Sequence, residues 1–346
     1  MDDLVELWEK PIAEEIYMIV GWHQWADAGA ISSGLPQYLI DQMGARKIGE
    51  IKSEGFYLFQ IPGTHHFLRP EIKLDEGYRK ELRIRKNEFF YSGDASKGLV
   101  VFLGEEPHLG VERYAEGFFN VAEQLGVKRA AAVGGVYAAV PYDKDREVSC
   151  VYSLPKMKNE LAEYAVRFSN YEGGTTIGTY LADRAEQRGV EFLVFYAFVP
   201  NYDFSELSRH LQGMRIETDF KAWYDLLRRF NHMFGLRLDL SDLERHSDEL
   251  LSSMEARIDE LERTMPQLGV REYIERLTRD FTEMPFMPLD EVWERARRSI
   301  SEHRGLKCKQ KSSPSERNYC WAPLWTPTRL TSRDSWPRSA LTCIVA

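Results

Sequence analysis

The sequence lacks the features that mark secreted, membrane-spanning and zinc-dependent proteins. Four cysteines in 346 residues, with no CxxC pair, do not predict a disulfide framework. There is no run of eighteen apolar residues, and the acidic residues 1–6 do not resemble a secretion signal. Neither HExxH nor paired Cys/His spacing occurs. We therefore expect a cytoplasmic protein with no membrane segment, no metal and no cofactor.

Positive charge is also scarce, because 45 Lys and Arg residues stand against 54 Asp and Glu residues, a net charge of -9. A general nucleic-acid binder needs clustered basic residues to displace counterions from phosphates, so no nucleic-acid partner is expected. Residues 305–346 are the exception, with seven basic and two acidic residues, three of the four cysteines and three of the eight tryptophans. This composition predicts a poorly ordered tail, which we interpret as non-native sequence; a basic partner-binding arm is the alternative.

The first 215 residues alternate short apolar runs with amphipathic stretches, which predicts an α/β domain with a parallel sheet. Strands are expected at 16–21, 46–56, 99–103, 129–133 and 192–196. Helices are expected at 28–43, with Asp27 as its cap, at 110–125 and at 175–188. A hairpin is expected at 72–84, around Asp75-Glu76-Gly77.

After residue 215 the pattern becomes helical. Helices are expected at 217–233, 239–265, 270–281 and 290–300, and the second and third carry apolar residues at 3-4 spacing, which favours an αα-hairpin. We thus predict an α/β core at 1–215, a helical extension packed on it at 216–304, and the tail at 305–346. An interaction module acting mainly through residues 239–300 is an alternative role for the extension.

In an open α/β sheet, ligands bind at the carboxyl ends of the strands. That rule selects seven candidate ligand-binding residues: Gly21, Trp22, His23, Gly134, Gly135, Asn201 and Tyr202. It also selects three candidates for general acid–base catalysis, because burial can tune carboxylates and imidazole toward neutral pKa: Glu105, Glu106 and His108.

One candidate anion site precedes a predicted helix, where free N–H groups and the helix dipole attract negative charge. It comprises Gly173, Gly174, Thr175 and Thr176. Because no P-loop lysine or GxGxxG accompanies it, the favoured interpretation is an ordinary helix cap at Thr175.

Nucleophilic catalysis finds little support. There is no GxSxG, Ser32-Ser33 lies inside the predicted first helix, and Cys150 stands in a strand-like context that predicts burial. The neighbours His65-His66 follow Pro62-Gly63 and are expected in a surface loop.

The order of several short motifs over residues 16–300 resembles the bacterial members of the proteasome assembly chaperone 2 family. The matching motifs are Trp25-Ala26-Asp27-Ala28-Gly29, Gln42-Met43-Gly44-Ala45, Phe102-Leu103-Gly104-Glu105-Glu106-Pro107, Arg113-Tyr114, Ala122-Glu123-Gln124-Leu125-Gly126-Val127, Gly134-Gly135, Val140-Pro141, Gly178-Thr179-Tyr180-Leu181, Val199-Pro200-Asn201-Tyr202 and Phe234-Gly235-Leu236.

The resemblance implies a three-layer α/β/α core like that of the phosphorylase and peptidyl-hydrolase group, assembled as a homo-oligomer such as a homotrimer. It implies a non-catalytic chaperone or scaffolding role with protein partners, of which proteasome subunits are one candidate. Two departures weaken an enzymatic role: Pro141-Tyr142-Asp143-Lys144-Asp145 replaces the Pro-His-Thr-Arg-Pro of many bacterial relatives, and Asn201 stands where they tend to have histidine. The alternative is a small-molecule enzyme or binding protein, such as a nucleoside or acyl-amide hydrolase, that uses the crevice at the strand ends.

Overall fold

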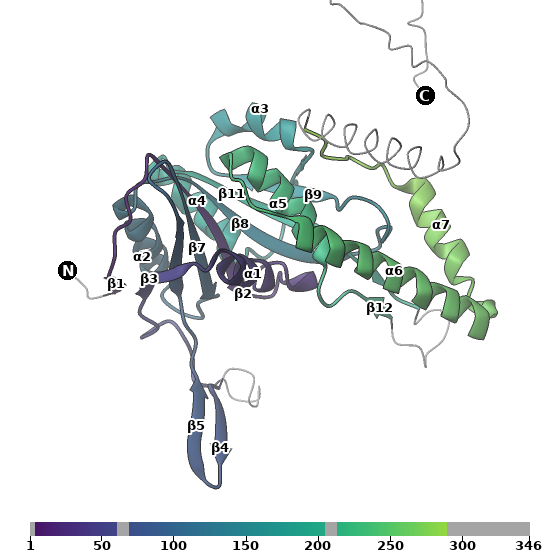
Figure 1. Cartoon of the computed structure of the whole chain (residues 1–346), viewed down its shortest axis with the longest axis horizontal. Coiled ribbons are helices and arrows are strands. Elements are labelled where there is room, and N and C mark those ends of the chain that lie inside the picture. The colour runs from purple at the N-terminus through teal and green to yellow at the C-terminus, as the bar shows by residue number, and fades with distance from the viewer. Residues whose placement is uncertain (1–3, 61–68, 205–212, 289–346) are drawn as a thin grey trace, which may run out of the picture. The chain divides into compact units, whose positions relative to one another are not determined.

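The apolar runs of the core form the centre of a ten-stranded mixed sheet, seen in a computed structural model (Figure 1). The structure describes residues 4–60, 69–204 and 213–288. Residues up to Pro288 form one compact unit. The predicted helix at 290–300, the tail at 305–346 and His65-His66 lie outside the described residues, and the predicted division at residue 215 stays a prediction.

Most strands of the main sheet are three to twelve residues long. Two further strands have only two residues each. The strands are β1 (Val5–Leu7), β2 (Glu15–His23), β3 (Arg46–Ile51), β4 (Glu71–Asp75), β5 (Tyr78–Arg83), β6 (Glu88–Gly93), β7 (Lys97–Glu105), β8 (Val127–Ala138), β9 (Val148–Tyr152), β10 (Arg167–Phe168), β11 (Glu191–Tyr202) and β12 (Met214–Arg215).

The helices connect these strands and then continue beyond them. They are α1 (Gly34–Met43), α2 (Val111–Gln124), α3 (Lys158–Leu161), α4 (Ile177–Arg188), α5 (Phe220–Phe234), α6 (Ser241–Thr264) and α7 (Val270–Asp280), with short 3-10 turns at Ala28–Ala30, Pro155–Met157, Ala162–Tyr164 and Pro266–Leu268. In the part of the chain that is described, no helix is both long and apolar enough to cross a membrane.

The sheet has a parallel centre with antiparallel pairs on both sides of it, and the outermost pair β9–β10 is again parallel. Its strand order is β1-β3-β6-β7-β2-β8-β11-β9-β10, and β12 pairs with β11. The pairs β7–β2, β2–β8 and β8–β11 are parallel, whereas β1–β3, β3–β6, β6–β7 and β11–β9 are antiparallel. The predicted parallel sheet is therefore confirmed for the four central strands.

Alternate residues of the central strands point into two cores, which makes three layers. On β2, Met18, Val20 and Trp22 belong to the core that α2 and α4 cover. Ile19, between them, belongs to the core that α1 and α5 cover. Both faces of these strands are buried, which explains why they read as continuous apolar runs. The predicted α/β/α core is confirmed.

The first predicted helix begins later than expected. A 3-10 turn occupies Ala28–Ala30, and α1 begins only at Gly34 and ends at the left-handed Gly44. Asp27 does not cap a helix at Ala28. Its carboxylate instead accepts the N–H groups of Ser32 (2.7 Å) and Ser33 (3.0 Å), so it fixes the turn that leads into α1.

Four predicted strand ends were placed too early, by two residues in β2 and β7 and by more in β8 and β11, and one was placed too late. The strand β8 runs through Gly134-Gly135, and β11 runs through residues 199–202, so neither segment is a loop. The strand β3 ends at Ile51 and does not reach Phe56. Glycine is depleted in strands, so Gly134-Gly135 predicts the end of this strand. The missing side chain instead allows close backbone packing, which is described below for Gly135.

The helical extension follows the predicted spacing. Met254 and Ile258 of α6 are buried, as are Val270 and Ile274 of α7, so the two apolar stripes contribute to one core. The turn at Pro266–Leu268 and the left-handed Gly269 reverse the chain between the two helices. The predicted αα-hairpin is confirmed.

A buried ion pair joins α5 to the segment between β8 and β9. The guanidinium of Arg146 donates to the carboxylate of Asp219 at 2.8 Å and 3.2 Å, and both side chains are almost fully buried. Asp219 also accepts the N–H of Ala222 and so caps α5. A buried pair loses hydration on both sides, so each member depends strongly on the other.

We expect Arg146→Met to lower the free energy of unfolding by about 3–5 kcal/mol, because it leaves the charge of Asp219 buried without a partner. Urea denaturation of the variant and wild type measures this difference. Arg245→Met, which removes two exposed ion pairs on α6, is the control and should change stability by less than about 1 kcal/mol. Equal losses in the two variants would contradict a special role for the buried pair.

Candidate functional site

The carboxyl ends of β7, β2, β8 and β11 lie side by side at one edge of the sheet, which we name the carboxyl edge. His23 at the end of β2 is in register with Glu105 at the end of β7. The predicted strand-end residues are thus brought to one edge. Gly21 and Trp22 lie within β2, and the Trp22 side chain is buried, where its indole N–H donates to the hydroxyl of Tyr114.

A buried polar cluster fixes the end of β7. The side-chain oxygen of Asn87 accepts the hydroxyls of Tyr57 (2.7 Å) and Tyr114 (3.1 Å) and the N–H of Glu105 (3.1 Å). Two candidate catalytic groups are held nearby: the Glu105 carboxylate pairs with Arg85, and Nδ1 of His108 accepts the N–H of Leu58. Both candidate groups therefore have partners within the protein.

The Glu106 carboxylate binds at the beginning of α4. It accepts the N–H of Ile177, the first residue of the helix, at 2.9 Å, and also a hydrogen bond from the backbone of Trp25. Thr176 is the actual cap residue, because its hydroxyl accepts the N–H of Thr179. The carboxylate of Glu106 thus lies beside the predicted anion site, where an external anion was expected.

Gly173, Gly174 and Thr175 precede this cap in an exposed turn. The hydroxyl of Thr175 donates to the carbonyl of Thr176, so the predicted cap residue is off by one position. The helix dipole and the free N–H groups that suggested an external anion are used by Glu106 instead.

Burial shifts the pKa of Glu106 and the pKa of His108 in opposite directions. It raises the pKa of Glu106, against the N–H groups of Ile177 and Trp25, which favour the charged form. It lowers the pKa of His108, and the nearby charge of Arg85 lowers that pKa further. Burial also raises the pKa of the Cys150 thiol to about 12, and the expected burial of this cysteine is confirmed.

The glycines of this edge permit close backbone contacts. A Cβ at Gly135 would lie 1.9 Å from the carbonyl oxygen of Ala28, and one at Gly21 would lie 1.9 Å from that of Ser32. Side chains are excluded at both positions because the segment between β2 and α1 lies directly on the sheet. Their role in this structure is packing.

Asn201 and Tyr202 lie in β11 and pair with β12, so they are not in a loop. The side chain of Tyr202 is buried, and its hydroxyl donates to the carbonyl of Val140 at 2.9 Å.

Sequence reasoning missed the apolar side chains that the carboxyl edge exposes. Trp25, Val136 and Tyr137 form what we name the edge patch, and 67% of the surface of Trp25 is exposed. The N–H of Gly135 donates to the carbonyl of Ala26 at 2.9 Å, so the backbone next to Trp25 lies beside β8 just before Val136 and Tyr137, whose side chains point to opposite faces of that strand. The sequence did offer one indication. Trp25 follows the end of a predicted strand, and its neighbours lack the apolar spacing that would predict its burial.

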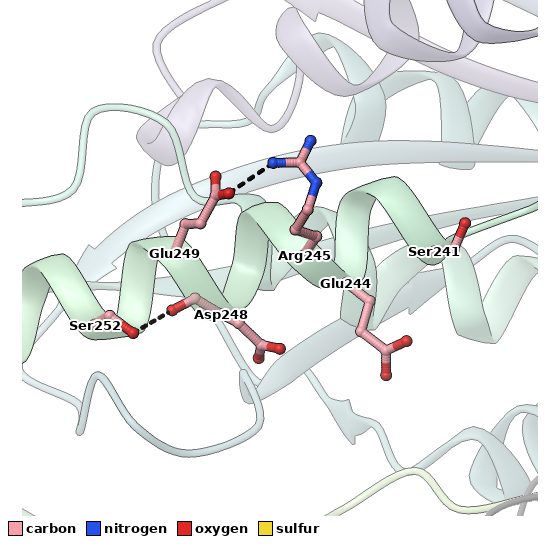
Figure 2. A pocket seen from close by; sticks show the side chains of 6 residues that line it. All are labelled: Ser241, Glu244, Arg245, Asp248, Glu249 and Ser252. Carbon is pink, nitrogen blue, oxygen red and sulfur yellow. Dashed lines mark hydrogen bonds and ion pairs between the residues drawn. The ribbon is translucent and has the colours of Figure 1, made fainter. Parts of the chain in front are cut away.

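Two surface hollows lie on the helical extension. One, of about 560 Å³, is lined by Ser241, Glu244, Arg245, Asp248, Glu249 and Ser252. Figure 2 shows that all six side chains come from one helix and that Arg245 bonds to Glu249.

The other hollow, of about 510 Å³, lies between the helices α6 and α7 and the segment after β8. Tyr142, Glu255 and Arg271 line it, and Glu255 accepts hydrogen bonds from both of the others. Within the described ranges, no three His, Cys, Asp or Glu residues are grouped to hold a metal ion.

Comparison with known proteins identifies relatives. The family model described as "PAC2 family" matches residues 21–260, whereas a search of curated proteins gave no match. A PAC2 family protein from Streptomyces avermitilis has 22% identity and a TM-score of 0.60, over 75% of this chain and 99% of that one. A proteasome-assembly chaperone homologue from Mycobacterium tuberculosis has 20% identity and a TM-score of 0.59, over 70% and 94%. The archaeal proteasome activator PbaB from Pyrococcus furiosus has 16% identity and a TM-score of 0.51, over 73% and 97%. These structures share the fold.

We expect Glu106→Gln to change how stability depends on pH. The native state holds the proton of Glu106 more tightly than the unfolded chain does, because its native pKa is raised. Wild type therefore loses stability as pH rises from the ordinary value of 4.5 through the raised native value, and this loss is absent in the variant. Melting temperatures between about pH 4 and about pH 7 measure it. Parallel pH profiles for the two proteins would contradict the burial argument.

Proposed function

This chain belongs to the PAC2 family, and from that premise we propose that it is a homo-oligomeric assembly or scaffolding factor that binds proteins without catalysing a reaction. A trimer is the assembly we favour. Binding takes place at the carboxyl edge, through the edge patch.

One observation carries the proposal: the carboxyl edge engages its charged groups internally and exposes apolar ones. Glu105, Glu106 and His108 each have a partner within the chain. Trp25 is mostly exposed, and aromatic side chains are enriched in protein interfaces. An edge of this kind suits a protein surface better than a polar substrate.

The nature of the partner follows from the relatives. The Mycobacterium tuberculosis protein is a homologue of proteasome-assembly chaperones, and PbaB is a proteasome activator. Proteasome subunits, or proteins that assemble like them, are thus the partners we propose.

The hydrolase alternative needs a carboxylate or imidazole that is free to exchange protons with a substrate. Glu106 would have to leave Ile177, and His108 would have to act through Nε2, because Nδ1 accepts the N–H of Leu58. This geometry favours the binding role.

Trp25→Ala should weaken partner binding without unfolding the protein. Removing a tryptophan from the centre of an interface costs at least about 2 kcal/mol, which is roughly 30-fold in affinity. Crosslinking in source cells followed by mass spectrometry measures the recovery of partners, and sedimentation measures self-association.

Trp8→Ala is the matched control, because Trp8 is 55% exposed but follows β1, at the opposite flank of the sheet. The proposal predicts that Trp8→Ala keeps the partners that Trp25→Ala loses. Equal recovery with both variants would refute a binding role for the edge patch. Saturable turnover of a nucleoside or acyl-amide, abolished by Glu106→Gln, would replace the proposal by the hydrolase alternative.

A further inference from the structure

The strands β4 and β5 form a separate two-stranded sheet with one apolar face, which extends from the main sheet (Figure 1). Ile72 is paired directly with Leu82, and Leu74 follows on the same side of β4, where a shift in register places it opposite Arg79. Ile84, just after β5, has the same alternation as Leu82. These four side chains, which we name the arm face, are between 44% and 58% exposed.

The opposite face of this hairpin is mostly polar, although it also carries the exposed side chain of Tyr78, which is paired with Asp75. Lys73 is paired directly with Glu81, and Glu71 lies opposite Arg83. A regular alternation of apolar and polar residues is the pattern of a strand with one buried face. Here every residue of both strands is exposed. The apolar side therefore has the residue types of a buried face but is open to solvent within one chain.

An isolated two-stranded hairpin is marginal in water, and clustered exposed apolar side chains mark interaction sites. The turn itself is well formed, since Glu76 and Gly77 both have positive φ, as a tight two-residue hairpin turn requires. The arm face is therefore a preformed surface that gains stability when something apolar covers it.

The hairpin is anchored at the carboxyl edge. The Arg85 side chain pairs with Glu105, the last residue of β7, and the carbonyl of Arg85 accepts the hydroxyl of Ser53 at 2.6 Å. The hairpin thus leaves the main sheet at the same edge that carries the edge patch. The arm face and the edge patch are both exposed within the chain, so the hairpin does not cover the patch of its own chain.

Charge favours a second copy of the chain as the occupant. Residues 69–86 contain seven basic and four acidic residues, a charge of +3, in a chain whose net charge is -9. The remainder therefore carries -12, so a hairpin is attracted to the body of another copy. Attraction between complementary charges steers encounter, while apolar burial holds the contact.

We propose that the arm face of one chain docks on the edge patch of a second copy, head to tail. The inference rests on the self-association proposed above and gives it a structural element. Two different surfaces meet in such a contact, and repetition of it by rotation closes a ring. Ile72, Leu74, Leu82 and Ile84 then cover Trp25 of the neighbouring copy, together with the face of its β8 end that carries Val136.

The test uses two full-length variants, each defective on one side of the contact. Ile72→Ser/Leu82→Ser impairs the arm face, and Trp25→Ser/Val136→Ser impairs the edge patch. Lys73→Ser/Glu81→Ser, a directly paired substitution on the opposite face of the hairpin that leaves net charge unchanged, is the matched control. Sedimentation velocity over a concentration series measures the assembly of each protein alone and of the two defective variants mixed.

The expected result is a roughly 100-fold increase in the dissociation constant for each defective variant, as loss of two aliphatic or aromatic contacts predicts, and no change in the control. The mixture should form a one-to-one heterodimer, because it combines one intact arm face with one intact edge patch. Failure of the mixture to associate would overturn the head-to-tail contact, and so would wild-type self-association of Trp25→Ser/Val136→Ser alone, which would indicate that hairpin packs on hairpin.

Assembly of Ile72→Ser/Leu82→Ser at wild-type concentrations would overturn the role of the hairpin and leave the proposed oligomeric function standing. A wild type that stays monomeric throughout the series would overturn both.

Discussion

The close approach of the segment between β2 and α1 to the sheet is the constraint on which the carboxyl edge depends. Gly21 and Gly135 leave room for the carbonyls of Ser32 and Ala28, and any side chain at either position would collide with them. With the segment held there, Asp27 organises the turn into α1 and Gly29 contacts the start of α5 through its carbonyl, which accepts the N–H of Asp219. The packing of this one segment thus positions the edge of the sheet, the start of α1 and the start of α5.

Electrostatics at this edge serves structure first. Carboxylates that would be costly to bury alone are balanced by N–H groups at Glu106 and by guanidinium groups at Glu105 and Asp219. Apolar side chains remain for the exterior. An edge built in this way has a fixed shape before any partner arrives, which lowers the entropic cost of association.

Much of the fold could be predicted from the sequence, because the burial of both faces of β2 and β7 leaves a continuous apolar run and the stripes of α6 and α7 have helical spacing. The end of β8 could not, since glycine usually ends a strand and the contact that requires Gly135 comes from a segment over a hundred residues earlier. The strand-end rule found the right edge. It could not reveal that Glu106 binds the α4 terminus, because that contact joins residues 71 positions apart.

The tethering of Glu106 beside Ile177 has a consequence for anions in solution. The Glu106 carboxylate competes with any external anion for the N–H groups at the start of α4. Because both belong to one chain, its effective concentration there is in the millimolar range that short tethers give. A phosphate or sulfate ion must exceed that internal competitor to reach the amide groups of α4. Because burial raises the pKa of Glu106, acidification neutralises this internal competitor at a higher pH than it would neutralise an exposed glutamate.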